Sequence, residues 1–195
     1  MLTEKLKSYN LILASGSPRR QQFFKDLGLD FEIRLKPVIE DYPNHLQHSE
    51  ITNYLAELKA LPFTEELIRN DILVTSDTIV WHQNKALGKP KNEAEAFEML
   101  KSMSNKTHDV ITSVCFTTKL NQSTVHCVTK VTFKDFTDQE IDFYVKTYKP
   151  FDKAGAYGIQ DWIGQIGVTN IEGSYFNVMG LPVHLVYQTL LQITN

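Results

Sequence analysis

The stretch LILASGSPRRQQFFKDLG, residues 11–28, decides the fold class of this chain. Its first four residues are apolar and are typical of a short buried strand. Ser17 and the proline after it are strong start signals for a helix, and Gly28 is a matching stop signal. Between these signals, Phe23 and Phe24 are expected on one buried helix face. A strand that leads directly into a helix is the repeating unit of α/β proteins.

Strand and helix patterns continue beyond this unit, but hairpins intervene among them. Residues 155–180 hold six of the nine glycines, which predicts a loop-rich segment between short strands. Thr137 with Glu140 matches a capping box at a helix start. The sequence therefore predicts an α/β protein with a mixed sheet. The expected elements are helices over 49–61, 92–103, 137–147 and 182–193, strands over 72–81 and 86–90, and a β-hairpin of 110–120 with 123–133.

Length and charge narrow the class of protein before any motif is considered. The chain has 195 residues, with 20 Lys+Arg against 23 Asp+Glu, 42% hydrophobic residues and a formal net charge of -3. This composition is that of an ordinary globular domain, and the length leaves room for one small extra lobe. The acidic balance argues against a nucleic acid as the main partner, whereas a small phosphate ligand needs only local positive charge.

Targeting signals and cysteines lead to an expectation about location. The apolar run near the N-terminus is too short for a signal peptide or a membrane span, so a cytoplasmic protein without a membrane partner is expected. Cys115 and Cys127 are the only cysteines, and each lies in an alternating, strand-like pattern. We therefore expect two buried thiols rather than a disulfide or a zinc site.

The helix start at ASGSPRR has the chemistry of a phosphate site. Unpaired backbone N–H groups and the helix dipole favour an anion there. Ser15 and Ser17 add hydroxyl donors, and Arg19 and Arg20 add guanidinium groups that suit phosphate oxygens. Cations in a first helical turn oppose the dipole unless an anion lies between them. The alternative is a capped helix with two solvated arginines.

Asp77 is unusual because it interrupts the apolar pattern ILVTSDTIVW of residues 72–81. Burying a carboxylate is costly unless it is paired, hydrogen-bonded or bound to a metal. We expect Asp77 at a strand end that faces a cleft, where it would serve as a general base or a Mg²⁺ ligand. The alternative, an aspartate that begins a turn, agrees less well with the apolar residues that follow.

The remaining candidates are weaker when each is taken alone. Lys59 ends a predicted helix, where a cation also complements the helix dipole. Lys89 and Glu40 lie in loops and could equally be ordinary surface residues. KAGAYGIQ, residues 153–160, has glycines on both sides of an aromatic residue. These glycines would either let a flat ligand approach the backbone closely or form simple turns between strands.

Taken in order, these motifs resemble the Maf family of nucleoside triphosphate pyrophosphatases. The resemblance runs along nearly the whole chain, and several ordered motifs are far more specific than any one of them. It implies an α/β fold similar to that of inosine-triphosphate pyrophosphatase, with an elongated mixed sheet and two lobes around a central cleft, in one domain over 1–195. The motifs are LILASGSPRR, Glu40, LAELKA with Lys59, SDTIV, LGKP, HDVIT (108–112), DKAGAYGIQ and GSYFNVMGLP.

The resemblance also implies an activity, in which a nucleoside triphosphate is hydrolysed to the monophosphate and pyrophosphate with the help of Mg²⁺ or Mn²⁺. Asp77 falls on the family's catalytic aspartate, which activates water. Glu40, Lys59 and Lys89 fall on the acidic and basic pocket positions, and Glu40 and Asp77 would hold the cation. Ser15, Ser17, Arg19 and Arg20 would hold the phosphate chain. Because family members are often homodimers, the resemblance leaves open the same assembly here.

At three positions the residues of this chain resemble those of the family branch that acts on dTTP and UTP. These are Arg20, Thr78 and Gln160, of which Thr78 and Gln160 would read the pyrimidine edge. Modified pyrimidine nucleotides such as pseudo-UTP and 5-methyl-UTP are expected substrates as well, in a house-cleaning role. Ser76 departs from the alanine that is more usual before the catalytic aspartate. The alternatives are a nucleotide-binding regulator of septum formation with little turnover and a nucleic-acid-binding protein.

Overall fold

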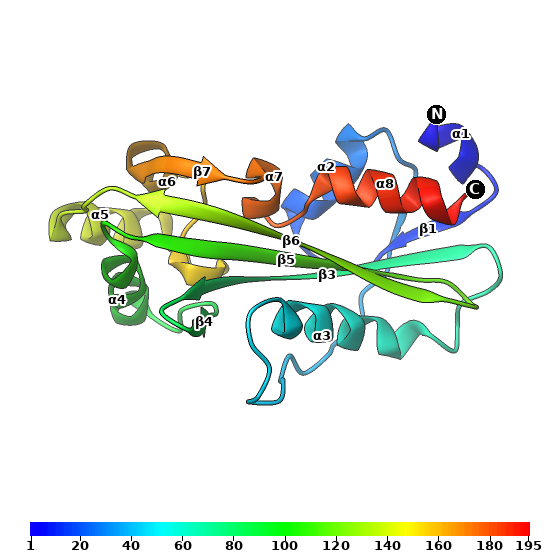
Figure 1. Cartoon of the computed structure of the whole chain (residues 1–195), viewed down its shortest axis with the longest axis horizontal. Coiled ribbons are helices and arrows are strands. Elements are labelled where there is room, and N and C mark those ends of the chain that lie inside the picture. Colours follow the sequence, from blue (N-terminus) through cyan, green and yellow to red (C-terminus); the bar gives the residue numbers. More distant parts are fainter. The chain divides into compact units, whose positions relative to one another are not determined.

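The computed structural model describes residues 1–195 and contains seven strands in one mixed sheet. The strands are β1 (Asn10–Leu13), β2 (Glu32–Ile33), β3 (Asp71–His82), β4 (Lys85–Leu87), β5 (Thr107–Thr117), β6 (Gln122–Phe133) and β7 (Val168–Glu172). Their order is β2-β1-β3-β5-β6-β7, and β4 pairs with β3 off this path (Figure 1). β1 pairs parallel with β2 and β3, whereas β4 and β7 pair antiparallel with their neighbours. The predicted α/β class with a mixed sheet is confirmed.

Eight α-helices and two short 3₁₀ segments accompany the sheet. They are α1 (Leu2–Leu6), α2 (Pro18–Asp26), α3 (Ser49–Ala60), η1 (Leu61–Phe63), α4 (Glu93–Met103), α5 (Asp138–Tyr148), η2 (Ala154–Ala156), α6 (Trp162–Gly167), α7 (Tyr175–Val178) and α8 (Val183–Ile193). Ser17 caps α2 and Gly28 follows its end with φ +67, as predicted. The capping box of Thr137 and Glu140 is also present at the start of α5. No helix combines the length and apolar character needed to cross a bilayer.

The chain forms two compact units. The first unit comprises residues 1–77, 112–127 and 180–195, and the second comprises 78–111 and 128–179. In the first unit α3 packs on one face of the strands, where its Ala56 and Ala60 belong to one hydrophobic cluster with Ile12, Leu73 and Cys115. Helices α2 and α8 lie on the other face (Figure 1).

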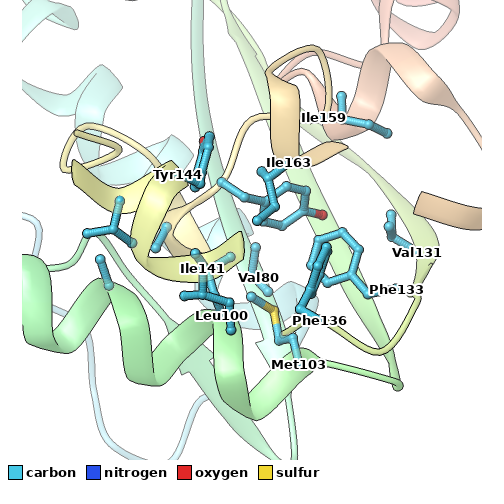
Figure 2. Packing of buried hydrophobic residues seen from close by; sticks show 14 of the residues in the cluster. Val80, Leu100, Met103, Val131, Phe133, Phe136, Ile141, Tyr144, Ile159 and Ile163 are labelled. Atoms are coloured by element: carbon cyan, nitrogen blue, oxygen red, sulfur yellow. The ribbon is translucent and has the colours of Figure 1, made fainter. Parts of the chain in front are cut away.

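The core of the second unit is a cluster of buried apolar and aromatic side chains (Figure 2). Leu100 of α4 and Ile141 of α5 pack in it together with Val80 of β3 and Phe133 of β6 (Figure 2). Fully burying one such side chain stabilises the fold by about 1.5–3 kcal/mol. The cluster therefore gives this unit a core of its own.

Two expectations from the sequence need correction. Only Cys115 is buried, because Cys127 lies in the half-exposed part of β6; neither cysteine forms a disulfide. Residues 155–180 contain helices α6 and α7 and one strand, rather than loops between short strands. The glycines of α6 serve close packing: a Cβ on Gly164 would lie 2.1 Å from the Ile159 carbonyl oxygen.

Candidate active site

Asp77 lies in the middle of β3, not at its end as the sequence predicts. The strand that ends is its neighbour, because the pairing of β1 with β3 begins at Asn10 with Asp71 and ends at Leu13 with Val74. Asp77 therefore lies just beyond the last residue of β1, where the sheet loses one strand. This position keeps Asp77 in an extended, apolar strand and still leaves room for a polar partner.

Helix α3 supplies that partner. Thr75 and Asp77 point to the same face of β3, since side chains alternate along a strand. The Thr75 hydroxyl donates to the Ala56 carbonyl at 2.6 Å, which ties this face to α3. Lys59 lies in the last turn of α3, and its Nζ donates to Asp77 Oδ1 at 2.7 Å.

Glu40 completes a three-residue cluster with Lys59 and Asp77. Lys59 Nζ lies 3.1 Å from Glu40 Oε1, so one ammonium bridges two carboxylates. The side chains are 10% exposed for Asp77, 18% for Lys59 and 49% for Glu40, which orders the cluster from inside to outside. The ion pair offsets the cost of burying the Asp77 carboxylate. Three residues that are far apart in the sequence are thus brought together, with one net negative charge.

The start of α2 is held by its own serines. Ser15 Oγ accepts from the Ser17 amide at 3.3 Å, and Ser17 Oγ accepts from the Arg20 amide at 3.5 Å. Gln21, whose role no sequence motif predicts, donates from Nε2 to the Ser15 carbonyl at 3.1 Å. Both hydroxyls keep their own O–H groups as donors for an anion, while their lone pairs cap the helix.

Arg20 reaches two main-chain carbonyls of the same unit. Its Nε donates to the Gly180 carbonyl and its Nη1 to the Ser76 carbonyl, each at 2.8 Å. Burial lowers the pKa of Arg20, while the negative charges of Asp77 and Glu40 act in the opposite direction. Arg20 therefore fixes the strand directly before Asp77. Its neighbour Arg19 lies half-buried in the same helical turn.

Thr78, Lys89 and Gln160 belong to the second unit. Lys89 is exposed in the loop after β4, and Gln160 is half-exposed at the end of the 153–160 segment. The Gly155 amide donates to the Gly88 carbonyl at 3.0 Å, so this segment is joined to the residue before Lys89. A Cβ on Gly155 would lie 2.7 Å from Val80 Cγ2, close to Thr78 along β3.

The aromatic residue of the 153–160 segment does not form a stacking surface for a ligand. Tyr157 is buried, and it packs with Phe133 and His108. Gly155 makes a turn at φ +67 against β3. The interpretation as structural glycines is therefore the one that agrees with the geometry. His108, which is part of the HDVIT motif, forms a hydrogen bond with Tyr157, and no local sequence pattern predicts this contact.

The cluster suits a cation that brings ligands of its own. No group of three or more His, Cys, Asp or Glu side chains within residues 1–195 could hold a metal ion. Mg²⁺, however, is usually bound by one or two carboxylates together with substrate phosphates and water. Glu40 and Asp77 supply such a carboxylate pair. Their oxygens face a common point, which the Lys59 ammonium occupies.

Comparisons with known proteins agree with this chemistry. A family model described as Maf-like protein matches residues 10–193. A protein of Flavobacterium johnsoniae named dTTP/UTP pyrophosphatase is 68% identical over 190 residues, which are 97% of this chain and 98% of that protein. A protein of Flavobacterium psychrophilum with the same name is 58% identical over 194 residues and the full length of both chains.

Among solved structures, the Ham1 protein of Staphylococcus aureus is similar to this chain. It superposes with a TM-score of 0.54 and covers 94% of this chain and 99% of its own. The sequence identity is only 13%, so this similarity shows the fold alone.

Proposed function

This chain belongs to the Maf family, and we propose that it hydrolyses dTTP and UTP to the monophosphate and pyrophosphate. Support comes from its relatives, since proteins 68% and 58% identical to it are named dTTP/UTP pyrophosphatase. These matches extend over 97% and 100% of this chain. In this role the protein would remove pyrimidine nucleotides, modified ones among them, from the cytoplasmic pool.

The observation that carries the proposal is the Glu40–Lys59–Asp77 cluster and its link to the start of α2. Arg20 joins the two, because it is part of α2 and its Nη1 donates to the carbonyl of Ser76, the residue before Asp77. A helix start with two arginines suits a phosphate chain. A carboxylate next to this phosphate chain can orient a water molecule for attack. Phosphoryl transfer depends mainly on such positioning of the reacting groups and on compensation of the phosphate charge.

In the proposed reaction, a water molecule attacks the α-phosphorus. Its oxygen forms the new P–O bond while the bond from the α-phosphorus to the bridging oxygen breaks, and pyrophosphate leaves. Asp77 orients this water and takes its proton, which then passes to solvent. Arg19 and the helix start hold the phosphates, and Lys59 stabilises the charge that develops on the leaving pyrophosphate. Lys89 has the same assigned role only through the resemblance to the family.

A divalent cation, Mg²⁺ or Mn²⁺, fits this proposal as an ion that enters with the substrate. Glu40 and Asp77 would hold it, and when bound it would neutralise phosphate charge and polarise the phosphoryl oxygens. Lys59 touches both carboxylates and would have to give up part of these contacts. Thr78 and Gln160 are assigned to reading the pyrimidine edge, as in the branch of the family that this chain resembles.

A panel of nucleoside triphosphates tests the proposal. The purified chain is incubated with dTTP, UTP, pseudo-UTP, 5-methyl-UTP, CTP, GTP and 7-methyl-GTP, with Mg²⁺, with Mn²⁺ and with a chelator. We expect the monophosphate and pyrophosphate from the uracil and thymine nucleotides, and loss of turnover with the chelator. Tight binding of UTP without turnover would instead favour a nucleotide-binding regulator.

A further inference from the structure

The segment from Tyr157 to Asp161 carries Gln160, and each of its other residues has a buried or closely packed anchor. The Gly158 amide donates to the Tyr144 hydroxyl at 3.3 Å, and this hydroxyl donates to Asp161 Oδ2 at 2.9 Å. Ile159 lies so close to α6 that its carbonyl leaves no space for a Cβ on Gly164. Gln160 is therefore held from both sides, while its own main-chain carbonyl accepts from Gln165 Nε2 at 3.0 Å.

The backbone that leads into this segment is strained. Gly155 has φ +67, and the next residue, Ala156, has φ 60 although it carries a Cβ. An alanine in the left-handed region persists only where its surroundings impose it, and such residues gather at functional sites. Ala156 is completely buried. Contacts of the neighbouring residues must therefore hold the backbone in this strained conformation, and Tyr157, the next residue, makes such contacts.

Tyr157 is anchored by one polar contact inside an apolar core. Its hydroxyl and His108 Nε2 lie 2.8 Å apart, and His108 comes from β5. The ring of His108 packs against Phe133 at 4.9 Å, and its Nδ1 is buried without a partner. Burial lowers the pKa of His108 to about 3, so the imidazole is neutral at neutral pH. A neutral hydrogen bond of this kind adds little net stability but strongly defines orientation.

From these contacts we propose that the His108–Tyr157 hydrogen bond is a positioning pair that determines base selectivity through Gln160. The proposal rests on the proposed function. Uracil and thymine present an acceptor at O4, whereas cytosine presents an amino donor at the same place. A glutamine amide carries both donors and an acceptor, so it can satisfy either base if it is free to move. Selection of uracil over cytosine therefore requires that the Gln160 amide be held in one orientation, and a fixed Gln160 backbone limits the positions that this amide can take.

The test compares kcat/KM for UTP and CTP in the wild type, in Tyr157→Phe and in Gln160→Ala. Tyr157→Phe removes one hydroxyl and keeps the ring, and Tyr175→Phe, at an exposed position on α7, is the matched control. We expect Tyr157→Phe to reduce the preference for UTP about tenfold, the scale of one lost hydrogen bond. The change should come mainly from KM for UTP, because the base is remote from the reacting phosphorus. Tyr175→Phe should keep the preference.

A double-mutant cycle separates positioning from a general loss of structure. If Tyr157 acts through Gln160, adding Tyr157→Phe to Gln160→Ala should not change the UTP/CTP ratio further. A second pair of variants covers failure of Tyr157→Phe to fold: His108→Gln, which keeps a hydrogen-bonding group, should retain more selectivity than His108→Phe. Thermal unfolding of every variant is followed alongside.

The outcomes are distinct. Equal losses for UTP and CTP in Tyr157→Phe, a full further loss of selectivity in the double variant, or a wild type that uses UTP and CTP equally would overturn the inference while leaving the proposed hydrolysis intact. A wild type that hydrolyses no nucleoside triphosphate would contradict the proposed function, and the positioning role with it.

Discussion

Lys59 Nζ lies 2.7 Å from Asp77 Oδ1, and this ion pair joins the last turn of α3 to the middle of β3. Because Asp77 is assigned to orient water and accept its proton, Asp77→Asn should lower kcat at least ~100-fold for UTP, the scale of general acid–base catalysis. The fold should persist, since an amide fits the same space, and circular dichroism would verify this. Turnover close to that of the wild type would exclude the assigned role.

The Lys59–Asp77 ion pair should also contribute to the stability of the fold. Lys59→Met leaves the Asp77 carboxylate buried without its cation, so the free energy of unfolding should fall by about 3 kcal/mol. Combining Lys59→Met with Asp77→Asn should recover part of this loss, because the uncompensated charge is then absent. Urea unfolding of the three variants measures both effects. Equal stabilities of the single and double variants would mean that the pair is a solvated surface contact.

Arg20 is expected to act on the position of β3 rather than through charge alone. Arg20→Lys keeps the charge but cannot reach the Gly180 and Ser76 carbonyls together, and hydrogen bonds from a charged donor contribute about 1.5–3 kcal/mol each. We therefore expect a loss of about 2 kcal/mol in unfolding free energy and a lower kcat. Arg19→Lys is the matched control, with a change within about 0.5 kcal/mol. If both variants have the same free energy of unfolding, the contacts of Arg20 with the two carbonyls do not stabilise the fold.

The Ser76 hydroxyl should lower the free energy of unfolding. Its Oγ is buried and has no hydrogen-bond partner in the protein. Ser76→Ala should therefore leave the free energy of unfolding unchanged or raise it by about 1 kcal/mol. Ser113→Ala is the control, because the hydroxyl of Ser113 is buried and bonded to Thr52 and Asn53, and its loss should destabilise by about 1–3 kcal/mol. Equal destabilisation of both variants would show that Ser76 has a partner.

His108 should make the fold sensitive to acid. Burial lowers the pKa of His108 from 6.5 to about 3, so the folded chain keeps it neutral while the unfolded chain protonates it below pH 6.5. The unfolded state then binds more protons between these values, and stability falls as pH drops through that window. In His108→Asn, the dependence of unfolding free energy on pH from 6 to 4 should be smaller by up to ~1.4 kcal/mol per pH unit. An unchanged slope would mean that His108 titrates normally in the fold.

Local patterns were sufficient for much of this fold. The Ser17 cap with Gly28 past the helix end, and the capping box of Thr137 and Glu140, each predict a helix that is present. These signals act between residues that are close in the chain. Helix α6 is not predicted from the sequence, because Gly164 and Gly167 disfavour a helix locally. Tertiary packing of Gly164 against Ile159 outweighs that local preference.

The candidate site, too, could be predicted only in part from the sequence. Residue types and motifs were sufficient to select Glu40, Lys59 and Asp77, but only the tertiary fold shows that one ammonium bridges both carboxylates. The part that Arg20 plays in holding the Ser76 carbonyl could not be read from the sequence, because it depends on where the chain returns after many residues. Cys127 was misjudged because alternation along β6 does not say which part of a strand is covered.

Hydrolysis of UTP by the wild-type chain in isotopically labelled water tests the proposed reaction most directly. Attack of water on the α-phosphorus places the label in UMP and leaves pyrophosphate unlabelled. We expect this pattern, with turnover lowered at least ~100-fold in Asp77→Asn. Release of UDP and orthophosphate, or a label found in pyrophosphate, would contradict it.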